Sequence, residues 1–121
     1  MKLRLLLWLM AMRFRRAIKR NPAMQAHLKD THRTVQFTAG DRVARYLAFA
    51  DLSFKSRARR AEQADLSLDF VTAPVGFRVL WKMATGADRN AIMRAIQDKE
   101  LHISGDPMLL MWFQKSVKYL R

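Results

Sequence analysis

The sequence has no cysteine, which excludes a disulfide framework, thiol catalysis and metal ligation by cysteine. Its four glycines are isolated from one another, so the chain has no glycine-rich loop of the kind that binds phosphate groups. The apolar run at 5–12 is also too short for a transmembrane helix, which needs about twenty residues. These absences leave a protein whose function must rest on charge and apolar surface.

Acidic residues are scarce, because ten Asp and Glu are outnumbered by 23 Lys and Arg among the 121 residues. The formal net charge is +13 and the sequence pI is about 11.3. Such a surplus favours an anionic partner, and both nucleic acid and acidic phospholipid qualify. Half of the residues are hydrophobic, so the chain is expected to fold as one domain with its own core.

Residues that could support catalysis are present, but they do not form catalytic or metal-binding motifs. His27 and His32 are five residues apart, which does not align them on a helix, and His102 is distant in sequence. Asp65 and Asp69 share one face of a predicted strand, where solubility or ion pairing explains them better than acid–base catalysis. No serine lies in a nucleophile-elbow context. The sequence therefore predicts a protein that is not an enzyme and uses no metal or cofactor.

Alternation of apolar and polar residues predicts five strands. They are placed at 33–38, 43–50, 52–58, 65–70 and 101–104. A turn is predicted at Ala39-Gly40-Asp41. The turn near Ala50-Asp51 contains no glycine, so one long bent strand in place of the second and third strands is an alternative.

Helical patterns precede, interrupt and follow these strands. A helix over the first twenty residues ends or restarts at Asn21-Pro22. Thr72 and Pro74 open a later helix that Gly86 closes, and Asp88 is expected to cap a shorter one. Asp106 is expected to cap the last helix. The order predicts an α+β fold, with an approximately five-stranded, mostly antiparallel sheet covered by helices on one face and an extra N-terminal helix.

The N-terminal helix combines an apolar run with a cluster of arginines and a tryptophan, the composition of an interfacial membrane anchor. Arginines follow the apolar run where a secretory signal would have a cleavage site, so secretion is not expected. The predicted membrane-binding residues are Trp8, Arg13, Arg15, Arg16, Lys19 and Arg20. The alternative is a helix that packs on the domain or on a second copy. We divide the chain into this segment, 1–32, and a domain at 33–121.

The last helix is more apolar than one buried face requires. Six apolar residues occur in a row at 108–113, whereas one face takes about three to four residues in two turns. The surplus must contact a bilayer, a partner chain or an apolar ligand in a pocket. The predicted ligand-binding residues are Phe77, Leu80, Trp81, Met108, Met111, Trp112 and Phe113.

Two short motifs resemble the sterol carrier protein 2 domain family. Ala64-Asp65-Leu66-Ser67-Leu68 matches its "Ala-Asp-x-x-Leu" strand, and the stretch from Lys99 to Asp106 is similar to its "Gly-Lys-Leu-x-Ile-x-Gly-Asp" strand and turn. The resemblance covers about residues 33 to 120, but the glycine expected before the Lys-Leu pair is missing. It implies an α+β fold with a hydrophobic tunnel and non-catalytic binding of lipids, sterols or fatty acyl groups. In bacteria it also implies an accessory role with hydrophobic intermediates, as in ubiquinone biosynthesis.

Three functions are consistent with the sequence. The first is binding or presentation of a lipid, fatty acyl, sterol-like or isoprenoid ligand by a cytoplasmic protein peripheral to the inner membrane. The second is nucleic-acid binding through the clusters Arg57-Arg59-Arg60 and Arg13-Arg15-Arg16, although no reading motif accompanies them. The third is a structural homo-oligomer joined through the apolar helices.

Overall fold

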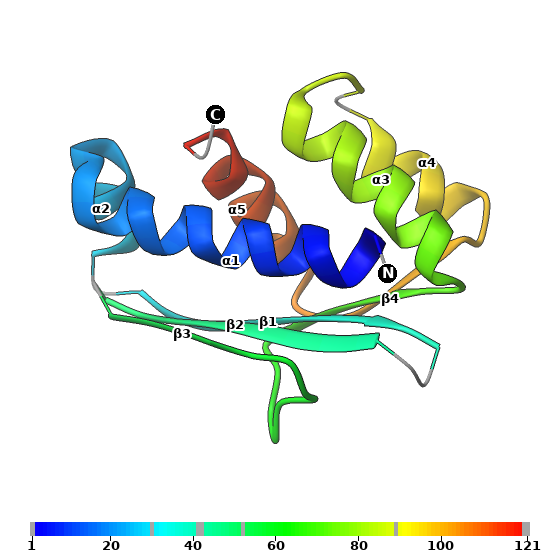
Figure 1. Ribbon diagram of the computed structural model, residues 1–121, viewed down its shortest axis with the longest axis horizontal. Helices are drawn as coiled ribbons and strands as arrows, with labels where there is room; N and C mark the ends of the chain where they lie inside the picture. The colour runs from blue at the N-terminus through cyan, green and yellow to red at the C-terminus, as the bar shows by residue number, and fades with distance from the viewer. Residues whose placement is uncertain (1, 30, 41–42, 52, 89, 120–121) are drawn as a thin grey trace.

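The five strands form one sheet in the order β3-β2-β1-β4-β5, and the helices lie on one face of it (Figure 1). The computed structural model describes residues 2–29, 31–40, 43–51, 53–88 and 90–119. The elements follow in the order α1 (Lys2–Arg20), α2 (Pro22–Leu28), β1 (His32–Ala39), β2 (Val43–Ala50), β3 (Ser53–Arg57), β4 (Leu66–Phe70), α3 (Ala73–Thr85), α4 (Ala91–Gln97), β5 (Leu101–Gly105) and α5 (Pro107–Lys118). Asp41 of the predicted turn and Leu52 of the third predicted strand lie outside the described residues.

The sheet is mostly antiparallel, as predicted, with β1 and β4 as its one parallel pair among the described strands. The connection 58–65 crosses the face of the sheet opposite the helices, which lets β4 pair with β1 in the same direction (Figure 1). The second and third strands form a hairpin, so the alternative of one bent strand is wrong. Asp51 makes this turn without glycine by taking a φ of 56°, a left-handed conformation that aspartate tolerates better than most residues.

The predicted helix ends are confirmed, with one exception. Thr72 Oγ1 accepts a hydrogen bond from the amide of Val75 at 3.3 Å, and Gly86 closes α3 in the left-handed region. The Asp106 carboxylate accepts one from the amide of Met108 at 2.9 Å. The prediction that Asp88 caps α4 is wrong, because α4 begins at Ala91. The Asp88 carboxylate instead accepts a hydrogen bond from the amide of Asn90 at 2.9 Å, just before the helix.

The turn before β5 lies where the glycine of the sterol-carrier motif is missing, because Asp98 precedes Lys99. Lys99 has a φ of 61°, so this turn is left-handed at a residue that has a side chain. At the other end of β5, Gly105 has a φ of 103°, and a Cβ there would lie 2.2 Å from the carbonyl oxygen of Asp65. Only glycine fits at Gly105, as the motif predicted.

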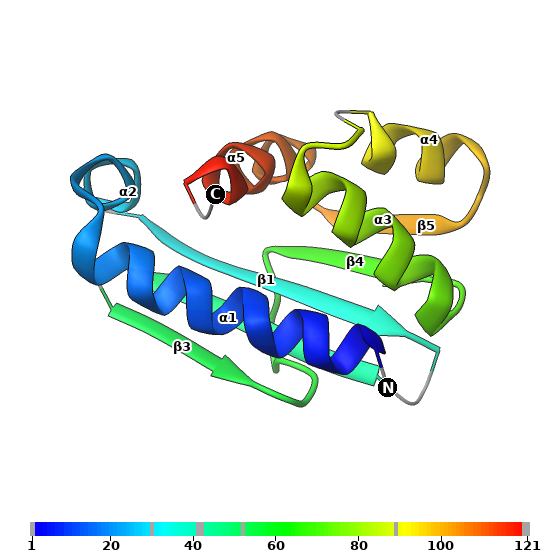
Figure 2. The same ribbon diagram turned by 45° about the horizontal axis from the view of Figure 1, so that its top comes forward.

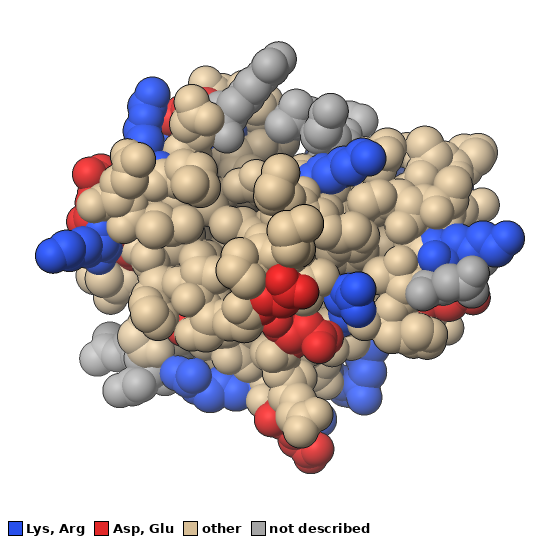
Figure 3. Space-filling view, turned by 180° about the vertical axis from the view of Figure 1, so that it is seen from behind, with Lys and Arg blue, Asp and Glu red and all other residues tan. Residues whose placement is uncertain are grey.

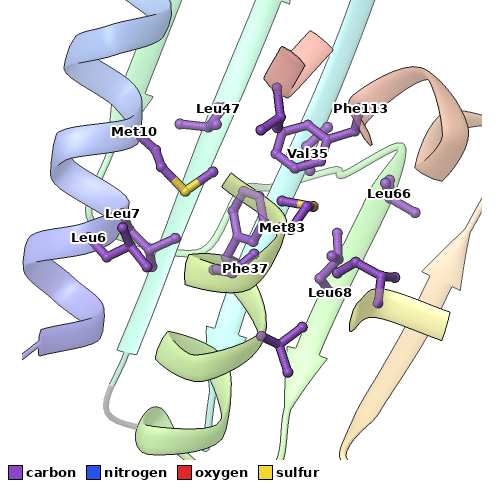
Figure 4. Close-up of a cluster of buried hydrophobic side chains, with 14 of the residues drawn as sticks. Leu6, Leu7, Met10, Val35, Phe37, Leu47, Leu66, Leu68, Met83 and Phe113 are labelled. Atoms are coloured by element: carbon purple, nitrogen blue, oxygen red, sulfur yellow. The ribbon is translucent and has the colours of Figure 1, made fainter. Parts of the chain in front are cut away.

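The hydrophobic core lies between the helices and the sheet, and α1 supplies one wall of it. Figure 4 shows side chains from α1, β1, β2, β4, α3 and α5 that point toward one another. Those of α1 include Leu6, Leu7 and Met10, all buried. Phe14 is completely buried, and its ring centroid lies 5.2 Å from that of Phe49 on β2. The N-terminal helix therefore packs on the domain, and one core runs through segments 1–32 and 33–121.

Different helices cover different strands of the sheet. Helix α1 lies over β2 and β3, whereas α3 and α5 contact β4 and α4 contacts β5 (Figure 2). At Gly76 of α3, a Cβ would lie 3.0 Å from Leu3 Cδ2, so the absence of a side chain lets α3 approach α1 closely. The outer surfaces of α1, α3 and α5 face away from the sheet.

Candidate functional site

The five helices contain no acidic residue. Twelve of the 23 Lys and Arg and none of the ten Asp and Glu fall within their bounds. We call α1 to α5 together the helical layer, and it carries twelve of the thirteen net positive charges. In the described part of the chain, every acidic side chain belongs to a strand or a connection. Viewed from behind, acidic side chains form small groups and much of the surface is uncharged (Figure 3).

The helical layer also exposes large apolar side chains. Met108 and Met111 of α5 are 72% and 67% exposed, and Trp81 of α3 is 49% exposed. On α1, Leu5, Trp8, Leu9 and Met12 are exposed, and on α4 Met93 is. Exposed apolar side chains at helix surfaces are candidate contacts for a membrane, a partner or a ligand.

The seven predicted ligand-binding residues divide between the core and the surface. Leu80 and Phe113 are completely buried, and Phe113 contacts Phe37 in the core with ring centroids 5.3 Å apart. Phe77 and Trp81 of α3 stack on each other at 5.8 Å, with Phe77 partly buried against the core and Trp81 exposed. Helices α3 and α5 are in contact, so the predicted residues of α3 (77, 80 and 81) and those of α5 (108 and 111–113) lie on adjoining helices.

Trp112 is half-buried and lies at the junction of α5 with α2. Its ring stacks on His27 at 5.3 Å and meets Phe49 edge-on. The cavities at the ends of α1 and α5, between α3 and α4, under the connection 58–65 and beside Arg4 are lined by none of the seven predicted residues. Their role in ligand binding stays a prediction.

The six predicted membrane-binding residues are all exposed, and all lie on α1. The outer side of α1 changes character along its length. Its N-terminal half exposes the apolar residues Leu5, Trp8, Leu9 and Met12, together with Arg4. Its C-terminal half exposes the basic residues Arg13, Arg15, Arg16, Lys19 and Arg20.

A groove of about 570 Å³ lies between the outer side of α1 and the C-terminal end of α5. Its lining consists of Leu9, Met12, Arg13, Arg16, Ala17, Arg20, Asn21 and Tyr119. Sequence reasoning selected three of its arginines but missed the other residues. The spacing of Leu9 and Met12 relative to Arg13 and Arg16 would have placed them on one helical stripe. No local signal could identify Tyr119, which is far away in the sequence.

His27 connects α2 to α5 beside this groove. Its Nε2 lies 2.8 Å from Ser116 Oγ, and its ring is 5.5 Å from that of Tyr119. Burial lowers the pKa of His27 below its usual value, a hydrogen bond to the backbone of Trp112 opposes this, and the charge of Lys115 adds to the lowering. The neutral imidazole is therefore the form that suits the folded protein.

The two arginine clusters considered for nucleic-acid binding belong to different parts of the fold. Arg59 and Arg60 line a cavity with Lys55 and Glu62, formed by the connection 58–65 and β1 to β3. That connection projects away from the helices, whereas Arg13, Arg15 and Arg16 belong to α1 (Figure 1). Arg60 also lines a cavity with Arg4 of α1 and Arg45 of β2, but neither of these two cavities is lined by Arg13, Arg15 or Arg16.

Solved structures share this arrangement of helices and sheet. The UbiJ-SCP2 ubiquinone synthesis protein is 20% identical, with a TM-score of 0.64 and 88% of each chain covered. A crystal structure of sterol carrier protein 2 is 13% identical, with a TM-score of 0.60 and 93% of each chain covered. The chain has a sterol carrier protein 2-like fold. The match to sterol carrier protein 2 covers 93% of this chain and so leaves out fewer residues than the 19 of α1. The structural similarity therefore begins within α1, whereas the resemblance in the sequence began at about residue 33.

The sterol-carrier-like fold also occurs as part of a larger protein. The stereoselective inverting sec-alkylsulfatase Pisa1 from Pseudomonas sp. is 18% identical with a TM-score of 0.59, and the match covers 75% of this chain but 14% of that enzyme. No protein-family model and no curated protein sequence matches the chain. Among the described residues, no helix has the length and hydropathy to cross a membrane, and no cluster of three or more His, Cys, Asp or Glu could bind a metal.

Proposed function

We propose that this protein is a non-catalytic carrier that binds a hydrophobic ligand and presents it at an anionic membrane surface, with the helical layer facing the membrane. The observation that carries the proposal is the composition of that layer, which has twelve basic residues, no acidic residue and exposed apolar side chains. Apolar side chains enter the interface between headgroups and acyl chains, while Lys and Arg attract anionic headgroups.

The sterol-carrier-like fold supports the choice of a lipid or isoprenoid as the ligand. One structural neighbour is a ubiquinone synthesis protein, which supports by analogy an accessory role in lipid or quinone biosynthesis. We place this role at the cytoplasmic face of the inner membrane as part of the proposal. The ligand would contact the exposed predicted residues Trp81, Met108 and Met111 and the partly buried Phe77, supported from below by Leu80 and Phe113.

Electrostatic attraction would supply much of the membrane affinity. A Lys or Arg near an anionic bilayer contributes about 1 kcal/mol, so the five basic residues in the C-terminal half of α1 together contribute several kcal/mol. This attraction decays over about 8 Å at physiological salt, so binding is expected to weaken as salt is added. The exposed Trp8 and Leu9 add a component that salt does not weaken.

Co-sedimentation with vesicles tests the docking face. We expect wild type to bind vesicles of phosphatidylcholine mixed with phosphatidylglycerol, and the variant with Arg13, Arg15 and Arg16 replaced by Glu to remain in the supernatant. The matched control replaces Arg33, Lys55 and Arg57 by Glu, which changes the net charge equally on strands β1 and β3. If the control loses as much binding, only net charge matters and the helical layer is not the docking face.

Lipid extraction and mass spectrometry of the purified protein test ligand binding. We expect a co-purified apolar molecule whose amount falls in Trp81→Ala and Met111→Ala, both exposed positions that the fold tolerates, but not in Met93→Ala on α4. Protein free of any apolar molecule, with no affinity for fluorescent fatty acids or isoprenoids, would refute the carrier role. A dimer whose interface covers Met108 and Met111 would favour the homo-oligomer instead.

A further inference from the structure

The groove beside α1 has an apolar end and a cationic end. Leu9 and Met12 lie toward the N-terminal half of the helix, and Arg13, Arg16 and Arg20 follow one or two turns later. From residue 9 to residue 20 the helix rises about 16 Å. In α1 the exposed residues change from apolar to basic along the helix axis. In a helix that lies flat in a membrane interface, the apolar and basic residues instead occupy opposite faces around the axis.

The cationic end has no acidic partner among the described residues. None of the described residues that line the groove is Asp or Glu. Within the described part of the chain, the salt bridges join Arg78 to Glu100 and Arg94 to Asp88, and neither involves α1. Guanidinium groups bind phosphate oxygens through paired hydrogen bonds, so three arginines around one groove complement a phosphate group well.

We infer that this groove binds a single phosphate-bearing lipid, with its phosphate among Arg13, Arg16 and Arg20 and its acyl chain along Leu9 and Met12. The ring of Tyr119 from the end of α5 provides the opposite wall. The volume, about 570 Å³, is within the usual range for small-molecule sites, about 300–1,000 Å³. The inference rests on the proposed function and adds that membrane recognition includes one stoichiometric headgroup site, besides diffuse attraction.

A short-chain lipid that stays monomeric in solution separates a site from diffuse attraction. We expect dihexanoyl phosphatidic acid to bind one molecule per chain in isothermal titration calorimetry. Arg16→Gln and Arg20→Gln should each weaken this binding about tenfold, the loss expected when a hydrogen bond to a charged group is removed.

Arg15→Gln and Lys19→Gln are the matched controls. They remove the same charge from the same exposed helix, but neither residue lines the groove. We expect each to weaken binding about twofold or less, because only long-range attraction is lost. Equal losses in groove and control variants would overturn the inference. Unfolding curves for all four variants confirm that the fold is unchanged, and Leu9→Ser provides a groove variant that leaves every charge in place.

Two further ligands identify which part of the lipid is recognised. Dihexanoyl phosphatidylcholine has the same chains without a net negative headgroup, and glycerol 3-phosphate has the phosphate without chains. We expect both to bind at least about tenfold more weakly than dihexanoyl phosphatidic acid, because each satisfies one end of the groove. Equal affinity for glycerol 3-phosphate would make this a site for free phosphate esters and would overturn the lipid assignment.

Vesicle binding by the same variants separates this inference from the proposed function. If wild type binds anionic vesicles while groove and control variants behave alike, the headgroup site is refuted and the docking face stands. If wild type binds no anionic vesicle, the proposed docking fails as well. One-to-one binding of phosphatidic acid that is lost only in groove variants supports both.

Discussion

Phe14 is the residue whose replacement tests most directly whether α1 is part of the domain or a detachable anchor. Its side chain is completely buried, and its ring lies 5.2 Å from Phe49, 6.2 Å from Phe54 and 5.9 Å from Phe113. One aromatic ring thus joins α1 to β2, β3 and α5. An anchor whose main contacts are with a membrane would not need such a residue.

We expect Phe14→Ala to lower the free energy of unfolding by about 3–5 kcal/mol, the range for removing a fully buried aromatic ring. That is a large share of the roughly 5–15 kcal/mol that stabilises a domain. With a urea dependence near 2 kcal/mol per molar, the midpoint of urea unfolding should fall by about 2 M. Circular dichroism at increasing urea concentration measures this midpoint.

Leu5→Ala is the control, because Leu5 lies on the same helix but is 63% exposed. It should change stability by about 0.5 kcal/mol or less. An unchanged midpoint for Phe14→Ala would refute the packing of α1 on the sheet. Equal losses in both variants would show that the buried aromatic contacts of Phe14 do not determine the result, because replacement by Ala raises helix propensity in both.

Three further predictions concern single residues. Lys99→Gly should raise the unfolding free energy by about 0.5–1 kcal/mol, because Lys99 has a positive φ. Lys82→Gly, inside α3, should lower it by about 1 kcal/mol, and urea unfolding measures both. Gly105→Ala should lower the unfolding free energy by about 2 kcal/mol or more, and Gly40→Ala should lower it by less. The reason is that a Cβ at Gly105 meets a backbone oxygen, whereas one at Gly40 meets nothing within 4 Å. Similar thermal unfolding temperatures for the two variants would contradict the clash. Because the pKa of His27 is lowered in the folded protein, the unfolded chain binds the proton more readily. The contribution of His27 to stability is therefore complete above its usual pKa of 6.5 and declines as pH falls toward the folded pKa. The unfolding free energies of wild type and His27→Gln, measured in urea, should differ less at pH 5.5 than at pH 7.5, and a constant difference would contradict this.

The sequence predicted what depends on neighbouring residues. Thr72, Gly86 and Asp106 act at helix ends through their own conformations and nearby amides, so their roles could be read locally. The apolar run at 108–113 predicted more apolar residues than one buried face can hold, and Met108 and Met111 are indeed exposed. Counting apolar residues did not show which ones face the core.

Features that depend on the path of the chain could not be predicted in this way. The pairing of β1 with β4 in parallel requires the connection 58–65 to cross the sheet, and that stretch carries only polar and small residues. Phe113 was predicted as a ligand contact, but its ring packs on Phe14 of α1 and Phe37 of β1, which lie far away in sequence. Leu80 is likewise completely buried. The groove also combines parts that are far apart in sequence, α1 and Tyr119.

The uneven distribution of charge across the sheet gives the molecule a large electric dipole. The helical layer is strongly positive, and the rest of the chain, with eleven basic and ten acidic residues, is nearly neutral. Within about a Debye length of a negatively charged surface, roughly 8 Å at physiological salt, the field exerts a torque that turns the helices toward that surface before any contact. A larger fraction of encounters then begins in the correct orientation, so the association rate, and not only the affinity, should fall as salt is added.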